Sequence, residues 1–480
     1  MSTFDKLSLP GEEIQALGRR ALDFIAAYYD GLASRPVVRH ASPSTLRELF
    51  EESLPQTGSD FQSLMDGVTR IAEFSRHNGH PRMFGYVTSP GTPICALGSL
   101  IESALNINVT SWRSGPAATE LEHVTVNWLK EMLGYPAEAA GILVSGGSLA
   151  NLAALTVARN AKAGVDVTRG GVAEVGRAMC LYVSEEGHFS IRKAARLLGI
   201  GAANVRAIKT TRRLAIDRDA LDRAVRADEA AGRLPFCVVA NAGSAATGAF
   251  DPIGELAEFA HSRNLWLHVD AAYGGFACLA PETRPLFEHI GEADSVTLDP
   301  HKWLYLPVGC GCVLYRDPAA ARSAFADDAE YTRAIGVEAE ESFAFWDYGP
   351  ELSRPFRALN LWLLIKYVGA LHLGAAIARN LACAARLEEL VTAADDFELL
   401  CPRGLSIICF RYRPQGFTGD VNTLNERILV SLQREGDSYV SNALVGEAFA
   451  LRACVLNHRT RFDDMEILLE DIRRAGGSAT

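Results

Sequence analysis

Residues 265–275 read LWLHVDAAYGG, and residues 295–304 read SVTLDPHKWL. Each stretch opens with a short apolar run typical of a buried strand and then reaches a charged residue, Asp270 in the first and Lys302 in the second. A buried carboxylate is costly unless it is paired, so Asp270 is expected to cap a turn, bind a metal or pair with a cationic nitrogen. A lysine between a histidine and a tryptophan is poorly placed for solvation, and a partly desolvated lysine can act as an amine nucleophile. Taken singly, Asp270 is more simply interpreted as a turn cap, and Lys302 equally well as a surface lysine.

Similar apolar runs alternate with amphipathic helical periods on either side of these two stretches. The other predicted strands are GILVSG (141–146), MCLYVS (179–184), NVRAI (204–208) and FCVVANAG (236–243). The predicted helices between them include residues 149–162, 191–198 and 253–263. Strands that are apolar throughout and separated by helices predict an α/β fold with a mostly parallel sheet covered on both faces. Ligand sites in such sheets lie beyond the carboxyl ends of the strands.

The chain divides into three predicted regions. Residues 1–80 carry helical periods but too few apolar residues for a core of their own, so they are expected to form a helical extension used in dimerisation. Residues 81–356 form the large α/β domain, and residues 357–480 a small C-terminal α/β domain. The most apolar segment, residues 359–378, is interpreted as one buried or dimer-facing helix.

Charge and hydropathy narrow the possible partners. The 480 residues hold 47 basic and 58 acidic side chains, which gives a formal net charge of −11, and 48% of residues are hydrophobic against 22% charged. This is the balance of an ordinary globular protein, and it disfavours nucleic acid, whose binding needs clustered lysine and arginine. We find no secretory signal pattern at the start of the sequence and no apolar run of about 18 residues, so we expect no membrane partner.

Cysteine usage points to a reducing compartment. The ten cysteines are scattered without a CxxC pair, and Cys310 and Cys312 are interpreted as buried thiols rather than a zinc site. No HExxH motif or comparable cluster is present. We therefore expect a cytoplasmic protein without a metal.

Two further features follow predicted strands. Ser145-Gly146-Gly147-Ser148 opens a helix, and its glycines, free N–H groups and Ser148 hydroxyl have the form of a phosphate cradle. The segment lacks GxGxxG and a Walker lysine, and alone it is as well interpreted as a tight strand-to-helix turn. His188, after the strand at 179–184, could be a ligand, a base, a stacking plane or a loop residue.

Together these features match the needs of one cofactor. Pyridoxal phosphate requires an anion cradle, an amine for a Schiff base, a carboxylate that keeps the pyridine nitrogen protonated, and a flat group over the ring. The sequence supplies these groups, in the same order, as the segment 145–148, Lys302, Asp270 and His188.

Several motifs also occur in a characteristic order over almost the whole chain. They are HPRMFGY (80–86), SGPAATELE (114–122), VSGGSLANLAAL (144–155), GHFSIRKAA (187–195), LWLHVDAAYGG (265–275), DPHKWL (299–304) and PFRALNLW (355–362). In these motifs the chain resembles the group II pyridoxal-phosphate amino-acid decarboxylases, the family of the aromatic amino-acid, histidine and glutamate decarboxylases. The resemblance implies the fold of type I pyridoxal-phosphate-dependent transferases, with a seven-stranded sheet, and a homodimer whose active sites are completed across the interface.

The resemblance also implies a role for each matching residue. The implied cofactor contacts are Gly147, Ser148, His188, Asp270, Ala272, Asp299, His301 and Lys302. Among them Lys302 forms the Schiff base, Asp270 bonds the pyridine nitrogen, and His188 stacks on the ring opposite the methyl group of Ala272. Tyr331, in the segment DDAEYTR, matches a mobile-loop tyrosine that is thought to protonate the α-carbon. Together with His188 it is a candidate for that proton transfer.

The implied reaction is decarboxylation of an L-amino acid, which releases carbon dioxide and an amine. One rival is decarboxylation-coupled oxidative deamination, which gives an aldehyde, ammonia and peroxide; another is β-elimination on an S-substituted cysteine. Tyr331 favours simple decarboxylation, because aldehyde formation in the family is associated with phenylalanine at that position. A catalytically inactive relative with a scaffold role is disfavoured, because it would be expected to lack Lys302, Asp270 or His188. A dinucleotide-binding protein is disfavoured because the GxGxxG motif is missing.

The sequence departs from the family pattern near the cofactor and in the side-chain pocket. Ala245 stands in a segment that is usually threonine-rich, so one hydroxyl near the cofactor is absent, and Asp299 stands where asparagine is common. Asp299 is expected either to repel the phosphate or to cap a turn. The positions matching the side-chain pocket are Tyr86, Val87, Asn108 and Thr110. Polar groups there forfeit apolar burial at about 25 cal/mol per Å², so we predict a polar or extended substrate. Arg354 and Arg357 match a basic segment for which a structural role is at least as good an explanation.

Overall fold

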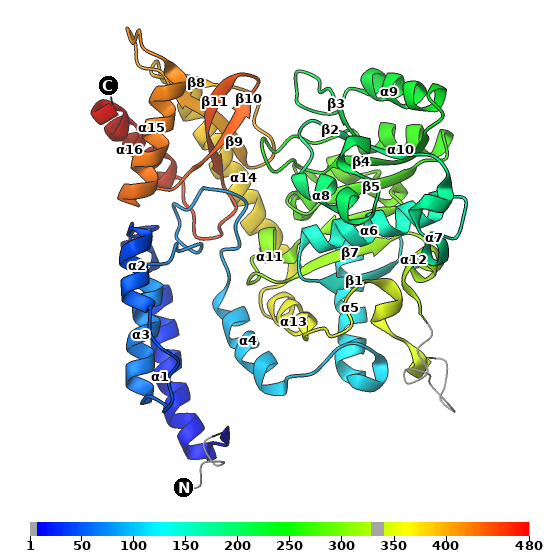
Figure 1. Ribbon diagram of the computed structural model, residues 1–480. Helices are drawn as coiled ribbons and strands as arrows, with labels where there is room; N and C mark the ends of the chain where they lie inside the picture. Colours follow the sequence, from blue (N-terminus) through cyan, green and yellow to red (C-terminus); the bar gives the residue numbers. More distant parts are fainter. Residues whose placement is uncertain (1–6, 328–339, 480) are drawn as a thin grey trace.

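The computed structural model describes residues 7–327 and 340–479, which form a large α/β body, a smaller α/β body and an N-terminal helical arm (Figure 1). Tyr331 lies outside the described residues.

The large body is built on a seven-stranded sheet with the strand order β1-β7-β6-β5-β4-β2-β3. The strands are β1 (Ala140–Val144), β2 (Met179–Ser184), β3 (Val205–Ile208), β4 (Leu234–Asn241), β5 (Trp266–Ala271), β6 (Ser295–Leu298) and β7 (Gly311–Tyr315). Strands β2 to β6 pair in parallel, whereas β7 pairs antiparallel with both β1 and β6. The prediction of a mostly parallel sheet is confirmed. Strand β7, which contains Cys312, was not among the predicted strands. The thiols of Cys310 and Cys312 are buried, as predicted.

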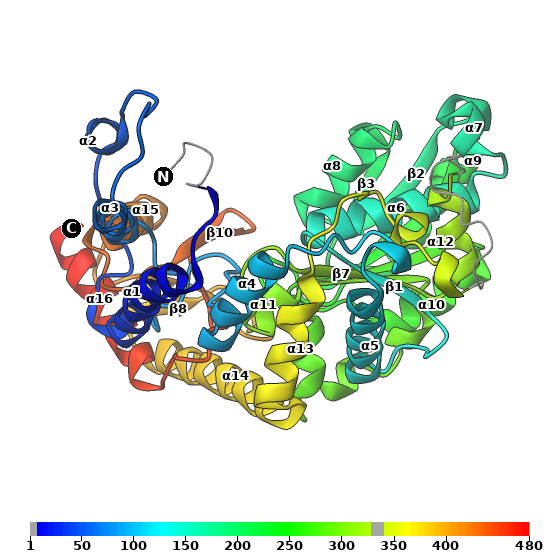
Figure 2. The ribbon, with the colours of Figure 1, turned by 90° about the horizontal axis from the view of Figure 1, so that it is seen from below.

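Helices cover both faces of this sheet. The helices of the large body are α4 (Pro93–Leu105), α5 (Pro116–Leu133), α6 (Gly147–Lys162), α7 (Val167–Gly170), α8 (Phe189–Leu197), α9 (Arg218–Ala230), α10 (Ile253–Ser262), α11 (Pro300–Trp303) and α12 (Pro318–Phe325), of which α4 packs on α13 (Arg357–Val368) of the smaller body rather than on the sheet. Helix α6 crosses one face with α8 and α12 beside it, and α5 and α10 lie on the opposite face (Figure 2). The N-terminus of α6 and the short helix α11 therefore meet at the same edge, where β1 and β6 end.

The smaller body packs helices on an antiparallel four-stranded sheet of order β10-β11-β9-β8. Its elements are α13 (Arg357–Val368), α14 (Ala370–Ala393), β8 (Phe397–Leu399), β9 (Ile407–Tyr412), α15 (Val421–Glu435), β10 (Ser441–Val445), β11 (Ala448–Cys454) and α16 (Asp463–Ala479). The prediction of one helix over residues 359–378 is wrong. Gly369, with φ of +81°, separates α13 from α14, and the two helices bend by 88°. Within the described ranges, no single helix is long and apolar enough to cross a membrane.

The N-terminal arm consists of α1 (Gly11–Asp30), α2 (Pro43–Phe50) and α3 (Phe61–Glu73). It lies on the side of the smaller body, away from the large sheet (Figure 1). No residue of these three helices is buried, and Ile14, Leu64 and Ile71 are each more than half exposed. The described part of the arm, residues 7–73, therefore has no core of its own in these three helices.

Candidate active site

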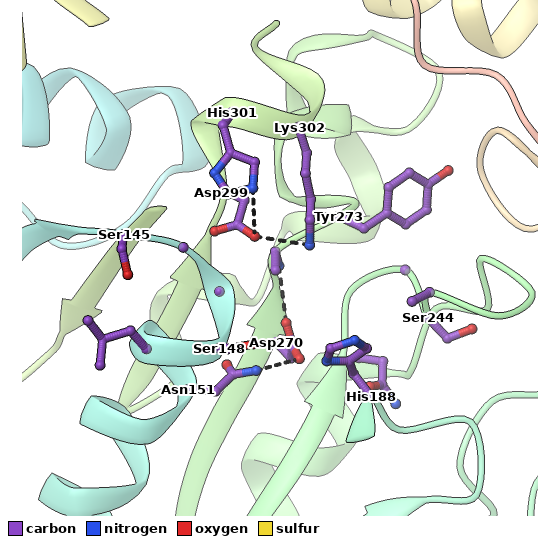
Figure 3. A pocket seen from close by; sticks show the side chains of 17 residues that line it. Ser145, Ser148, Asn151, His188, Ser244, Asp270, Tyr273, Asp299, His301 and Lys302 are labelled. Atoms are coloured by element: carbon purple, nitrogen blue, oxygen red, sulfur yellow. Dashed lines mark hydrogen bonds and ion pairs between the residues drawn. The ribbon is translucent and has the colours of Figure 1, made fainter. Parts of the chain in front are cut away.

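A cavity of about 310 Å³ lies at the carboxyl ends of the parallel strands (Figure 3). All the residues predicted to contact the cofactor line it: Gly147, Ser148, His188, Asp270, Ala272, Asp299, His301 and Lys302. They come from segments separated by more than 150 residues, so the fold brings the predicted cluster together. Ala245 also lines the cavity.

The side chain of Lys302 projects into the cavity from α11, whose backbone is held in place by contacts of the next residue. Its Nζ lies 3.0 Å from Oδ2 of Asp299, and its side chain is 21% exposed. The next residue, Trp303, is fully buried and stacks on Tyr273 with ring centroids 5.1 Å apart. Because the indole also donates to Oδ1 of Asn380, at 3.1 Å, the backbone that carries the amine is held on two sides.

Asp299 is buried and belongs to the cavity wall rather than to a turn. It precedes α11, but its side chain makes no capping hydrogen bond, so the capping alternative is wrong. Besides Lys302, its Oδ2 faces Nε2 of His301 at 3.7 Å. Its Oδ1 and Nδ1 of His301 are buried, and neither finds a hydrogen-bond partner among the described residues. Burial lowers the pKa of His301. These two unpartnered atoms are available to a bound group.

The predicted anion cradle lies at the start of α6. A Cβ atom added at Gly147 would lie 2.7 Å from Oδ2 of Asp299 and 3.0 Å from Cβ of Ala272, so only glycine fits without a shift. In the described part of the chain no side chain caps this helix N-terminus, which leaves its first N–H groups for an anion. The segment is a tight turn and also a cradle open to the cavity.

Asp270 is the penultimate residue of β5 and is 6% exposed. Its Oδ2 accepts a hydrogen bond from Nδ2 of Asn151 at 2.8 Å, and its Oδ1 accepts one from the backbone N–H of Ala272 at 3.2 Å. Within the described residues, Asp270 forms no salt bridge. A buried carboxylate held only by neutral donors is suited to receive a cationic nitrogen from a ligand.

His188 caps the N-terminus of α8. Its Nδ1 accepts the backbone N–H of Ser190 at 3.3 Å and lies 2.7 Å from the Ser190 hydroxyl. Burial lowers the pKa of His188, with Asp270 opposing the shift. Because Nδ1 is an acceptor, the neutral ring carries its proton on Nε2.

Sequence reasoning missed the polar residues behind the cavity. Asn151 lies on the buried face of α6, and Trp266 and His268 lie on the same face of β5 as Asp270. A polar residue at every second position of an otherwise apolar strand was the available signal.

The four predicted substrate residues do not line the cavity within this chain: Tyr86, Val87, Asn108 and Thr110. Tyr86 is half-exposed, and Oδ1 of Asn108 accepts the backbone N–H of Arg354 at 2.9 Å. Their role in substrate binding stays a prediction.

The donor set of the cavity fits pyridoxal phosphate. An amine, a buried carboxylate without a cation, an imidazole and an open helix N-terminus surround one space large enough for a small ring. The amine would bond to the imine carbon of the cofactor, the carboxylate would pair with its pyridine nitrogen, and the imidazole would lie on the face of its ring. The helix N-terminus would hold the phosphate.

Comparisons with known proteins agree with this chemistry. Residues 43–413 match the model of the pyridoxal-dependent decarboxylase conserved domain. The chain is 35% identical over 472 residues to the aromatic-L-amino-acid decarboxylase of Bacillus atrophaeus, covering 98% of this chain and 96% of that relative. It is 30% identical to a phenylacetaldehyde synthase of a Rosa hybrid cultivar, covering 93% and 91%. Oryza sativa TDC, crystallised with PLP and tryptamine, superposes with a TM-score of 0.91 at 29% identity, covering 98% of this chain and 99% of that one. The chain therefore belongs to the pyridoxal-dependent decarboxylase family, and its cofactor is pyridoxal phosphate.

Proposed function

We propose that this protein removes the α-carboxylate of an L-amino acid as carbon dioxide and releases the amine. The observation that carries the proposal is the convergence of Lys302, Asp270 and the open N-terminus of α6 on one cavity. Bound pyridoxal phosphate supplies an electron sink for the pair that is left when the bond between the α-carbon and the carboxylate breaks.

The residues of this chain have separate tasks in that reaction. Lys302 would hold the cofactor through its ε-amine and yield that position to the substrate amine. Asp270 would keep a proton on the pyridine nitrogen, because an anion beside a cationic nitrogen stabilises the charged form. Gly147 and Ser148 would bind the phosphate at the start of α6.

Return of a proton to the α-carbon needs an acid in the cavity. His188 carries a proton at Nε2 when neutral, which makes it one candidate. Tyr331 remains the other candidate from the sequence.

The nature of the substrate side chain is a separate proposal. Several relatives are named for aromatic substrates, the Bacillus decarboxylase among them. Val87, Asn108 and Thr110 nevertheless put small or polar groups at the matching positions, which supports a polar or extended side chain.

Oxidative deamination to an aldehyde, in which molecular oxygen is the oxidant and is reduced to peroxide, is the second candidate function. Two observations favour it: Ala245 lacks a hydroxyl at the cavity wall, and a relative with 30% identity is named phenylacetaldehyde synthase.

We also propose a homodimer located in the cytoplasm. The core-less N-terminal arm and the exposed Leu97, Leu100, Ile101 and Leu105 of α4 offer apolar surface for a second copy. All ten cysteines are unpaired, which supports a reducing compartment. Light scattering should give twice the mass of one chain; a monomer at working concentration would contradict the dimer.

The test is incubation of the holoenzyme with aromatic, acidic, basic and S-alkyl-cysteine amino acids while carbon dioxide, ammonia, peroxide and organic product are followed. Carbon dioxide and amine without ammonia support decarboxylation. Aldehyde with peroxide and ammonia supports the second candidate, and ammonia without carbon dioxide indicates elimination and contradicts both. Turnover restricted to aromatic substrates would contradict the polar or extended side chain.

A further inference from the structure

A chain of buried hydrogen bonds runs behind the cavity from β6 to Asp270. Nε1 of Trp266 lies 2.8 Å from Oγ of Ser295, and the same hydroxyl lies 2.9 Å from Nδ1 of His268. Nε2 of His268 lies 3.0 Å from Oδ1 of Asn151. These side chains are all less than 5% exposed, so water does not compete with the contacts.

The direction of every hydrogen bond in this chain can be assigned. Indole N–H can only donate, so Trp266 donates to Ser295, and the serine proton is left for Nδ1 of His268. A carboxylate can only accept, so the amide of Asn151 turns its Nδ2 toward Asp270 and its Oδ1 toward His268. His268 must then donate through Nε2. Burial lowers its pKa to about 4, so it is neutral at neutral pH with its proton on that nitrogen.

The network branches at Asn151. Besides the 2.8 Å contact with Asp270, Nδ2 of Asn151 lies 3.0 Å from Oγ of Ser190. Because this hydroxyl accepts from Asn151, its own proton is directed to Nδ1 of His188, 2.7 Å away. One amide therefore sets the orientation of Asp270. Through the Ser190 hydroxyl it also adds to the backbone N–H of Ser190, 3.3 Å away, in holding Nδ1 of His188 as an acceptor. Figure 3 shows Asn151 beside Asp270, with His188 on the other side of the carboxylate.

We propose that Asn151, held by His268, is a positioning residue that fixes the carboxylate of Asp270 and the Nε2–H tautomer of His188 as one coupled unit. The proposal rests on the proposed function, because both residues act on the cofactor. The physical basis is that the two amide hydrogens of Asn151 are donated to Asp270 and Ser190, one to each. The amide oxygen accepts from the buried ring of His268, so the amide cannot flip without losing these bonds.

The first test is histidine ¹⁵N NMR of the holoenzyme, with the two signals assigned from His188→Asn and His268→Gln. We expect both rings in the Nε2–H tautomer near neutral pH. Ser190→Ala removes the shorter contact of Nδ1, at 2.7 Å, and leaves only the longer backbone one, at 3.3 Å, so it should shift His188 toward a mixture of tautomers and leave His268 unchanged. An Nδ1–H tautomer at either ring in the unmodified protein would overturn the proposal.

The second test compares cofactor binding in Asn151→Leu, His268→Leu and His268→Gln. Losing a hydrogen bond to a charged group should weaken pyridoxal phosphate binding about tenfold or more in Asn151→Leu. It should also move the pH midpoint between the absorption bands of the bound cofactor. His268→Gln keeps an N–H that can reach Oδ1 of Asn151, so it should restore most of what His268→Leu loses. The other ionisable groups acting at this site, Asp299 and Lys302, are the same in all variants.

Asn425→Leu is the matched control, because Asn425 is a fully buried amide in the smaller body whose hydrogen bonds, among the residues that the structure describes, are to Tyr412 and Val421. It should lower stability without moving the absorption midpoint. If Asn151→Leu binds the cofactor with unchanged affinity and midpoint, or if His268→Gln and His268→Leu behave alike, the positioning role is refuted. Unmodified protein that binds no cofactor would instead refute the proposed function.

Discussion

Replacing Arg354 tests whether the basic segment at the end of the large domain is structural or binds substrate. The Arg354–Glu122 pair is buried, with side chains 1% and 0% exposed. Arg354 also donates from Nη1 to the carbonyl of Val109 and from Nη2 to that of Leu143, each at 2.7 Å. Neither member of the pair lines the cavity. The guanidinium therefore ties the segment before α5 to the strand that leads into the phosphate cradle.

Arg354→Met should destabilise the protein by about 3–5 kcal/mol, because it leaves the carboxylate of Glu122 buried and uncompensated. Glu122→Gln combined with Arg354→Met removes both charges and keeps an acceptor for the backbone N–H of Leu143, 2.9 Å from Oε1. The double variant should recover about 2 kcal/mol or more of that loss.

The assay is urea unfolding of the holoenzyme at fixed protein and cofactor concentrations, since both shift the apparent stability. Arg357→Met is the control: Arg357 pairs with Glu351 at 2.8 Å, but that carboxylate is 20% exposed, so the loss should be smaller. If Arg354→Met raises KM tenfold while its urea midpoint is unchanged, Arg354 contacts substrate and the structural account is wrong.

Three further changes have defined outcomes. Asp299→Asn removes a negative charge from the cavity wall beside the phosphate cradle, and like charges repel strongly where the effective dielectric is low. Equilibrium dialysis should therefore show about tenfold tighter cofactor binding or more. Weaker binding would mean that the ion pair between Asp299 and Lys302, at 3.0 Å, matters more than the repulsion. Gly147→Ala places a methyl group 2.7 Å from Asp299 and 3.0 Å from Ala272, so cofactor affinity should fall at least tenfold; equal affinity would show that the cradle is not used. The pKa of His268 is lowered from 6.5 to about 4, so its contribution to stability is complete above pH 6.5 and about 3 kcal/mol is lost as the pH falls to 4. His268→Gln should flatten that part of the urea-midpoint curve, and an unchanged slope would contradict the buried neutral ring.

Residues at strand ends were predictable because parallel strands place their carboxyl ends at one edge of the sheet. This rule was enough to bring Asp270 and Lys302 together with the start of α6. The bend at Gly369 was not predicted, because an apolar run has the same periodicity whether or not a glycine with positive φ divides it.

Contacts between layers were beyond the sequence pattern. Asn151 and His268 meet only because α6 crosses β5 at one register, which the periodicity of neither element defines. Asp299 likewise has the sequence position of a helix cap. In the structure its buried carboxylate pairs with Lys302 and does not cap the helix.

The central claim is that the ε-amine of Lys302 holds pyridoxal phosphate. Borohydride reduction of the holoenzyme, followed by peptide mapping, should find a single phosphopyridoxyl label on the peptide that contains residue 302, and Lys302→Ala should abolish it. A colourless protein in the presence of the cofactor, or a label on another lysine, would contradict the account.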